Sequence, residues 1–287
     1  MSQQAASAPP DARSSAVKSN TDFAIGLARA AAGAVIFALP MIMTMEMWFL
    51  GFTIARVKLA LLLGLNFPLL VGLSHYFGFE ETFELKEDLL DACVAYGVGF
   101  ITSIVGLLVL GVIDPGMSAD EIVGKVAIQA VPASLGALLA QSQLGQFNAE
   151  DEERQHPLTY GGVLFIMIAG ALFLSLNLAP TEEIILIAFR MTIWHALILI
   201  GLSLAGMHGF VYTFKFRGQP DAPPGTPAWS LFIRFTVVGY VLALLVSLLV
   251  LWIFGRVENT AYDQILMIVV VLGFPAAIGA AAARLIL

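Results

Sequence analysis

The sequence predicts an all-α polytopic membrane protein with about eight transmembrane helices, arranged as two parallel four-helix repeats. Three observations carry this prediction: the composition, the length of the apolar runs and an internal repeat. Of the 287 residues, 59% are hydrophobic and only 12% are charged. An average soluble domain is about 25% charged. Too few polar side chains therefore remain to cover a water-soluble globule of this size.

The apolar runs are continuous rather than alternating, which excludes a transmembrane β-barrel. Because a helix needs ~20 apolar residues to cross a bilayer, the runs predict spanning helices. Their expected ranges are 30–52, 58–78, 89–113, 122–144, 160–179, 184–212, 230–254 and 263–286. The fourth is the least apolar, since it contains Lys125, Gln129 and Gln141.

Polar segments divide the chain into parts. Residues 1–22 are rich in Ser, Ala and Pro and are expected to form a disordered cytoplasmic tail. The tail lacks the apolar core of a cleavable signal peptide, so the first span is expected to act as the insertion signal. The first four-helix repeat is expected at 23–144, an acidic linker at 145–159 and the second repeat at 160–287.

An even number of spans places both termini on the same side of the membrane. With the ranges above, that side carries most of the 14 Lys and Arg residues. Because basic residues concentrate in cytoplasmic loops, both termini are expected in the cytoplasm. The localisation that follows is the inner (plasma) membrane of a bacterium, crossed several times.

An internal repeat is the third observation. The segment VGLLVLGVI at 105–113 is similar to VSLLVLWIF at 246–254, and the 122–140 segment is similar to 265–283 through a shared Pro-Ala-x-x-Gly-Ala pattern. The Ala-Gly-Ala around Gly33 also matches the one around Gly170. Similar segments that occur in the same order in both halves predict an internal duplication. Two halves with four spans each insert the same way up, so a two-fold axis along the membrane normal is expected to relate them.

Charged residues lie in or beside the spans at matching places in the two halves. Glu46 and Arg56 occupy the first half, and in the sequence alignment of the halves Glu183 and Arg190 correspond to them. An ionisable group in a span costs about 2.5–3.5 kcal/mol without a partner or water. One interpretation is structural ion pairs between helices. The other is a polar vestibule on the pseudo-axis that selects or gates a small charged solute.

Pro132 and Pro275 fall near the middle of the fourth and eighth spans. A proline in a helix frees the carbonyl four residues back, which needs another partner in a bilayer. The prolines are interpreted either as packing kinks or as paired breaks whose carbonyls, with Gln129, face a cavity. Small residues after each proline, including Gly136, predict close helix packing. His195 is a candidate for proton transfer or for a hydrogen bond between helices.

Several functional classes lack support. The single Cys93 allows no internal disulfide and no cysteine metal site. No HExxH, GxSxG, Walker-type or GxGxxG pattern occurs, so we expect no catalytic residue, metal ligand or cofactor and no enzymatic activity. A net charge of −7 argues against nucleic acid as a partner. The expected partners are membrane lipid and an ion or small solute, and a homo-oligomer is compatible with the small-residue stripes.

The run MEMWFLGFTIARVKLALLLGLN, the segment VPASLGALLAQSQLG and the eight-span layout together resemble a bacterial family of integral membrane proteins catalogued as a domain of unknown function. The resemblance covers residues 23–287. It implies an inner-membrane location and assigns no activity and no functional residue.

Duplication and charge within the membrane together favour a small transporter or channel-like permease. Its solute would pass near the interface between the halves, with Glu46, Arg56, Glu183 and Arg190 at the outer approach. The alternative is a structural or sensory membrane subunit whose acidic loops bind a partner. A membrane-embedded enzyme is a third hypothesis, which would need two catalytic groups to converge, such as His208 and an acid.

Overall fold

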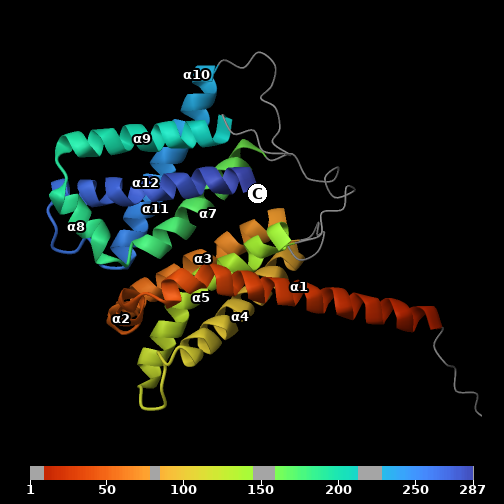
Figure 1. Cartoon of the computed structure of the whole chain (residues 1–287). Coiled ribbons are helices and arrows are strands. Elements are labelled where there is room, and N and C mark those ends of the chain that lie inside the picture. The colour runs from red at the N-terminus through yellow and green to blue at the C-terminus, as the bar shows by residue number, and fades with distance from the viewer. Residues whose placement is uncertain (1–9, 78–84, 145–158, 213–227, 287) are drawn as a thin grey trace, which may run out of the picture.

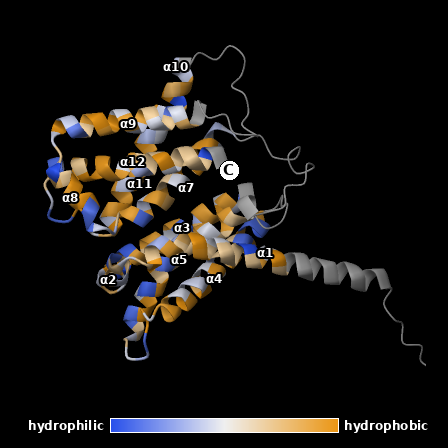
Figure 2. Cartoon of the chain, in the orientation of Figure 1, coloured by the Kyte–Doolittle hydropathy of each residue, from blue (hydrophilic) through white to orange (hydrophobic). Residues whose placement is uncertain are grey.

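The computed structural model describes residues 10–77, 85–144, 159–212 and 228–286 (Figure 1). The regular structure in these ranges is entirely helical, and eight of the helices are long and apolar enough to cross a membrane. Apolar residues cover most of the helix length, and polar residues gather toward the helix ends and the turns (Figure 2). The expectation of an all-helical protein with eight candidate spans is confirmed.

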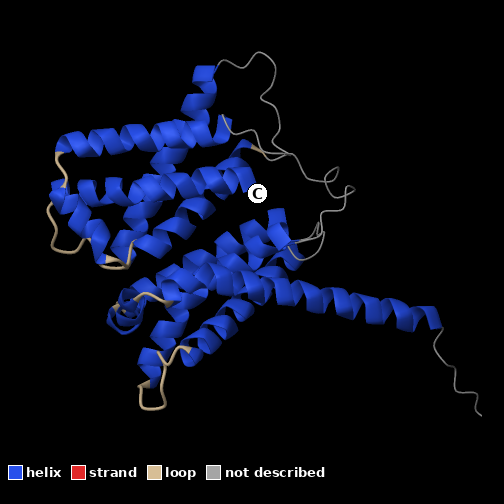
Figure 3. Cartoon of the chain, viewed as in Figure 1, coloured by secondary structure: helices blue, strands red, loops and turns tan. Residues whose placement is uncertain are grey.

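The helices are connected by short turns where the chain is described (Figure 3). The first half contains α1 (Pro10–Ile42), α2 (Met45–Thr53), α3 (Arg56–Phe77), α4 (Leu85–Val109) and α5 (Ala119–Leu144). The second half contains α7 (Tyr160–Leu178), α8 (Glu182–Arg190), α9 (Ile193–Tyr212), α10 (Ala228–Leu231), the π-helix η1 (Phe232–Val237), α11 (Val238–Ile253) and α12 (Tyr262–Ile286). Helix α1 begins inside the segment predicted to be a tail, while residues 1–9 and the linker residues 145–158 lie outside the described ranges.

Each half is a bundle built around its last helix. Helix α5 packs against α1, α2, α3 and α4, and α12 packs against α7, α8, α9 and α11. In the apolar stretch of α5 83% of the residues are buried, against 17% in that of α9. The least apolar predicted span is therefore the innermost one, because its polar residues are shielded from lipid by the helices around it.

Helices α1 and α7 run in similar directions, and so do α5 and α12 (Figure 1). In Figure 1, α1 and α7 both run toward the end of the molecule that carries α2 and α8, and α5 and α12 both run back from it. We call this end the α2/α8 end; by the predicted topology it is the outer end. The C-terminus lies at the opposite end.

Two predicted spans are wrong in their extent. The range 30–52 is divided into α1 and α2, and the range 184–212 is divided into α8 and α9. Before each short helix a threonine in an extended conformation bonds back to the preceding helix: Thr44 Oγ1 donates to the Met41 carbonyl and Thr181 Oγ1 donates to the Leu178 carbonyl, both at 2.8 Å. These bonds satisfy carbonyls that the ending helix leaves open.

The break changes one predicted correspondence. Glu46 and Glu183 are each the second residue of a nine-residue helix, α2 or α8, so they do occupy matching places. Arg56 is the first residue of α3, whereas Arg190 is the last residue of α8. The two arginines therefore do not correspond, because the sequence match ran across the turn between the two helices.

The helix crossings in the two halves share one construction. A Cβ atom at Gly33 of α1 would lie 2.4 Å from the Gly136 carbonyl oxygen of α5, and a Cβ at Gly170 of α7 would lie 2.3 Å from the Gly279 carbonyl oxygen of α12. Only glycine allows backbones to approach this closely. The close packing predicted at Gly136 is confirmed, and it joins helices within one half.

The turns that follow α4 and α11 are also alike. Gly111 and Gly255 have φ angles of 68° and 72°, the left-handed region that glycine adopts without cost. The residue after each glycine donates its backbone N–H to the carbonyl five residues back: Val112 to Leu107 at 2.9 Å, and Arg256 to Leu251 at 2.8 Å. Both helices thus end in the same hydrogen-bonded glycine turn.

Candidate functional site

A pocket of about 250 Å³ lies at the α2/α8 end, where the two halves meet. The first half contributes the end of α2 and the start of α3, and the second half contributes the end of α11 and the turn after it. The lining residues are Leu50, Thr53, Ile54, Ala55, Lys58, Ile253, Phe254, Gly255 and Glu258. Polar atoms make up the larger part of the accessible lining, and its two charged residues come from opposite halves.

Lys58 and Glu258 form an ion pair across this pocket. The Lys58 ammonium group also donates to the Trp252 carbonyl oxygen at 2.8 Å and lies 5.1 Å from the centre of the Trp252 ring. The Lys58 side chain is 15% exposed, whereas Glu258 is 59% exposed. The lysine is thus held from several sides, while the carboxylate is free to exchange its partner with water or a solute.

Arg256 lies two residues before Glu258 and points back into the second half. Its Nη2 donates to the Pro180 carbonyl at the end of α7, and its Nε is buried without a hydrogen-bond partner among the described residues. Burial lowers the pKa of Arg256, while the charges of Glu182 and Glu46 act in the opposite direction. Because an arginine side chain keeps its proton under ordinary conditions, a fixed positive charge sits beside the pocket.

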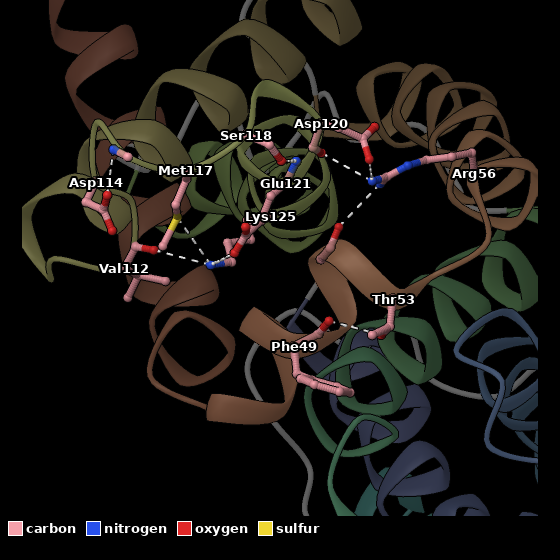
Figure 4. Close-up of polar contacts among 12 residues, drawn as sticks. Phe49, Thr53, Arg56, Val112, Asp114, Met117, Ser118, Asp120, Glu121 and Lys125 are labelled. Carbon is pink, nitrogen blue, oxygen red and sulfur yellow. Dashed lines mark hydrogen bonds and ion pairs between the residues drawn. The ribbon is translucent and has the colours of Figure 1, made fainter.

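Arg56 belongs to a second polar cluster at this end, within the first half (Figure 4). It forms an ion pair with Asp120 at the start of α5 and donates to the Gly51 carbonyl at 3.4 Å. Deeper in the same cluster, Lys125 is 6% exposed and lies 2.7 Å from Glu121. The contacts of Arg56 tie α2, α3 and α5 together, which agrees with its structural interpretation, whereas Lys125 and Glu121 pair within α5.

The other predicted charged residues are spread over the α2/α8 end. Glu46 is half-buried near Arg256, whereas Glu183 and Arg190 are exposed on α8. His195 is exposed near the start of α9; its Nδ1 accepts the Thr192 backbone N–H at 3.3 Å and lies 2.7 Å from the Thr192 hydroxyl. The structure therefore gathers Glu46 with the pocket region and leaves Glu183, Arg190 and His195 on the outside of the second half.

The predicted mid-span residues lie away from the pocket. Pro132 is buried in α5 and Pro275 is half-buried in α12, and both helices continue through the proline. Gln129 is 1% exposed; its Nε2 donates to the Met41 carbonyl at 3.2 Å, and its Oε1 has no partner within the described residues. Among the described residues, therefore, Gln129 is tied to α1 rather than to the pocket.

The residues that build the pocket were not singled out from the sequence. Lys58, Arg256 and Glu258 are isolated charges near span ends, a position that snorkelling side chains commonly occupy. Lys58 and Glu258 are 200 residues apart in the chain, so no local pattern links them. A useful signal would have been the Gly-Arg pair after the seventh span, since a glycine there marks a helix end and the arginine follows it into the turn.

In the described part of the chain no group of three or more His, Cys, Asp or Glu residues is placed to hold a metal ion. The pocket offers charge of both signs and a lining of polar and apolar atoms between the two bundles. Such an arrangement can bind and orient a small ionic or zwitterionic molecule.

Comparison with known families gives one result. The model of the family described as "Putative integral membrane protein (DUF2391)" matches residues 26–287. The chain belongs to this family. The match begins within α1 and covers every later helix of this DUF2391 protein, so the eight candidate spans are part of the shared domain. Neither the curated proteins nor the solved structures give a match to the chain.

Proposed function

We propose that this membrane protein is a transporter or channel-like permease rather than an enzyme, and that a small ion or solute crosses between its two halves. The proposal places it in a bacterial inner membrane with both termini in the cytoplasm, so the pocket faces outward. The observation that carries it is the pocket itself, which lies at the interface of two bundles and brings together Lys58 and Glu258. Sites between structural repeats are typical of transporters.

We also infer that the two halves arose by duplication. The glycine crossings at Gly33 and Gly170, the glycine turns at Gly111 and Gly255, and the paired short helices α2 and α8 support this inference. The common direction of α1 and α7 agrees with halves inserted the same way up. A parallel pair of bundles leaves a seam along the membrane normal, and a solute path along that seam would begin at the pocket.

The charges of the pocket favour a charged solute. Glu258 is largely exposed and Lys58 is largely covered, so an incoming cation would compete with Lys58 for the carboxylate, and an anion would compete with Glu258 for the ammonium. Either exchange would break the link that joins the two halves at this end. Solute binding would thereby be coupled to loosening of the seam.

The test is a flux measurement with purified protein in proteoliposomes, using a panel of K⁺, Na⁺, H⁺ and Cl⁻ gradients. Lys58→Met and Glu258→Gln should each change the flux by about tenfold, a change of ~1.4 kcal/mol in the barrier. Arg56→Gln is the matched control, since it breaks an ion pair at the same end that does not line the pocket. If no gradient dissipates faster than in empty vesicles, and the variants fold normally, the proposal is wrong.

A structural or sensory subunit is the second candidate. The continuous burial of α5 from Gly124 to Ala140 favours it, because a tightly packed helix is what a scaffold needs. If this candidate is correct, none of the tested gradients dissipates faster than in empty vesicles. A partner protein should then co-purify through the acidic linker 145–157, and a variant with neutralised linker charges is the control.

A further inference from the structure

The contact between the two halves is head-to-tail rather than symmetric. The first half presents α1, α3, α5 and the α2–α3 junction, and the second half meets them with α7, α11 and the turn after α11. In the correspondence between the halves, α9 is the counterpart of α3 and α4 is the counterpart of α11. In Figure 1, α9 and α4 lie on opposite outer sides of the molecule. A symmetric two-fold contact would have brought α9 against α4 as well. Head-to-tail contacts leave each end of the assembly with an unused copy of the same surface.

The unused surfaces can be identified residue by residue from the correspondence between the halves. Lys58 is the third residue of α3, and His195 is the third residue of α9. Glu258 follows Gly255 by three residues, and Asp114 follows Gly111 by three residues. His195 therefore occupies the position in the second half that Lys58 occupies in the first, and Asp114 occupies the position in the first half that Glu258 occupies in the second.

The apolar residues of the interface show the same relationship in their burial. Ile253, which precedes Gly255 by two residues, is 1% exposed, whereas Val109, which precedes Gly111 by two residues, is 80% exposed. Leu50 is 6% exposed, whereas Ile187, at the same position of α8, is 46% exposed. Positions that one half covers are thus uncovered in the other.

Lipid contact alone accounts for the exposed apolar side chains, but the charges on the two surfaces are also complementary. Arg190 and His195 are exposed on the second half, and Asp114 is exposed on the first. His195 Nδ1 accepts the Thr192 backbone N–H, so a neutral ring carries its proton on Nε2 and can donate to a carboxylate. The α8–α9 junction offers donors and positive charge, with Glu182 and Glu183 at the far end of α8, and the α4–α5 turn offers an acceptor and negative charge.

We propose that a second copy of this chain docks head-to-tail on the first, with the α8–α9 junction of one copy on the α4–α5 turn of the next. The proposal rests on the correspondence between the halves and not on transport. In the contact, His195 of one copy meets Asp114 of its neighbour, as Lys58 meets Glu258 within the chain. The contact encloses a second pocket equivalent to the one described, so the site between halves is repeated between copies.

The test is cysteine cross-linking in native membranes, in a Cys93→Ala background. The double variant Asp114→Cys/His195→Cys should form cross-linked oligomers with a short bifunctional thiol reagent. Each single variant should stay uncross-linked, because a head-to-tail contact brings together two different residues. Membranes that contain both single variants should give dimers and nothing larger. Val123→Cys/His195→Cys is the control, since Val123 is 62% exposed and its counterpart Leu266 is also 66% exposed, outside the contact between the halves.

A second measurement separates failure of folding from failure of the proposal. Single-molecule photobleaching of the labelled wild-type chain in membranes should show more than one step per particle. Asp114→Asn should reduce the fraction of multi-step particles, although its side-chain oxygen can still accept the Gly116 N–H that Asp114 accepts at 2.7 Å. One-step particles throughout, or cross-linking of either single variant, would overturn the proposal. These readouts do not depend on flux.

Discussion

The glycine crossings allow a matched test of the packing within each half. Substitution Gly33→Ala places a methyl group 2.1 Å from the Ala140 Cβ and 2.4 Å from the Gly136 carbonyl oxygen, whereas ordinary contact begins at 3.4 Å. The carbonyl is backbone and cannot rotate away, so α1 and α5 must separate by roughly an ångström. Overpacking of a well-filled interior costs about 1–3 kcal/mol, and we expect the upper part of that range here.

Gly64→Ala in α3 is the control, because a Cβ at Gly64 would meet no atom within 4 Å. The gain in helix propensity from glycine to alanine, about 0.5–1 kcal/mol, is common to both variants and cancels in the comparison. Gly170→Ala and Gly201→Ala repeat the pair in the second half. The assay is equilibrium unfolding in mixed detergent micelles, followed by tryptophan fluorescence. If Gly33→Ala unfolds within about 0.5 kcal/mol of Gly64→Ala, the close crossing is not present in the protein.

Three further predictions concern the α2/α8 end, each checked by thermal unfolding in detergent. Glu121→Gln leaves the buried Lys125 ammonium without its counter-charge and should lower the free energy of unfolding by up to about 3 kcal/mol. The double variant Lys125→Met/Glu121→Gln should recover most of this loss. If it does not, the ion pair does not stabilise the protein. Gly111→Ala and Gly255→Ala should each cost about 1–2 kcal/mol, since both glycines are left-handed; an effect at one site alone contradicts the common turn. Arg256→Met should cost about 1–3 kcal/mol through the orphaned Pro180 carbonyl, and an unchanged midpoint contradicts that bond.

The eight candidate spans could be predicted because lipid imposes a length and an apolarity on each of them. The break at Thr44, inside the predicted range 30–52, and the break at Met191–Thr192, inside the predicted range 184–212, could not, because each lies within a run that is apolar enough to form one span. At Thr44 the division depends on a threonine hydroxyl that bonds to the preceding helix, and threonine also occurs inside spans, as Thr102 does. Composition predicts which segments lie in the membrane, but it does not predict where a helix within such a segment ends and the backbone turns.

The candidate site was less accessible from sequence than the fold. Glu46 and Arg56 were expected as neighbours, but Arg56 pairs with Asp120, because the turn between α2 and α3 directs it toward α5. The pocket charges Lys58 and Glu258 come from different halves and meet through tertiary packing alone. A repeat in the sequence predicts that two bundles exist and does not state which faces of them touch.

The structure also explains why the least apolar span can exist in a membrane. Lys125 and Gln129 lie on α5, which is enclosed by the other helices of its half. The Lys125 ammonium pairs with Glu121 and Gln129 Nε2 donates to the Met41 carbonyl, and these contacts offset part of the cost of burial. A helix exposed to lipid, such as α9, carries no charged group within its span.

The claim that solute passes through the pocket between the halves is tested most directly by blocking that pocket chemically. Thr53, at the end of α2, lines it, whereas Val57, at the start of α3, is 81% exposed and does not. In a Cys93→Ala background, an impermeant thiol reagent added outside proteoliposomes should abolish flux in Thr53→Cys and leave flux in Val57→Cys unchanged. Equal flux in the two labelled variants, or block of both, would contradict a path through the pocket.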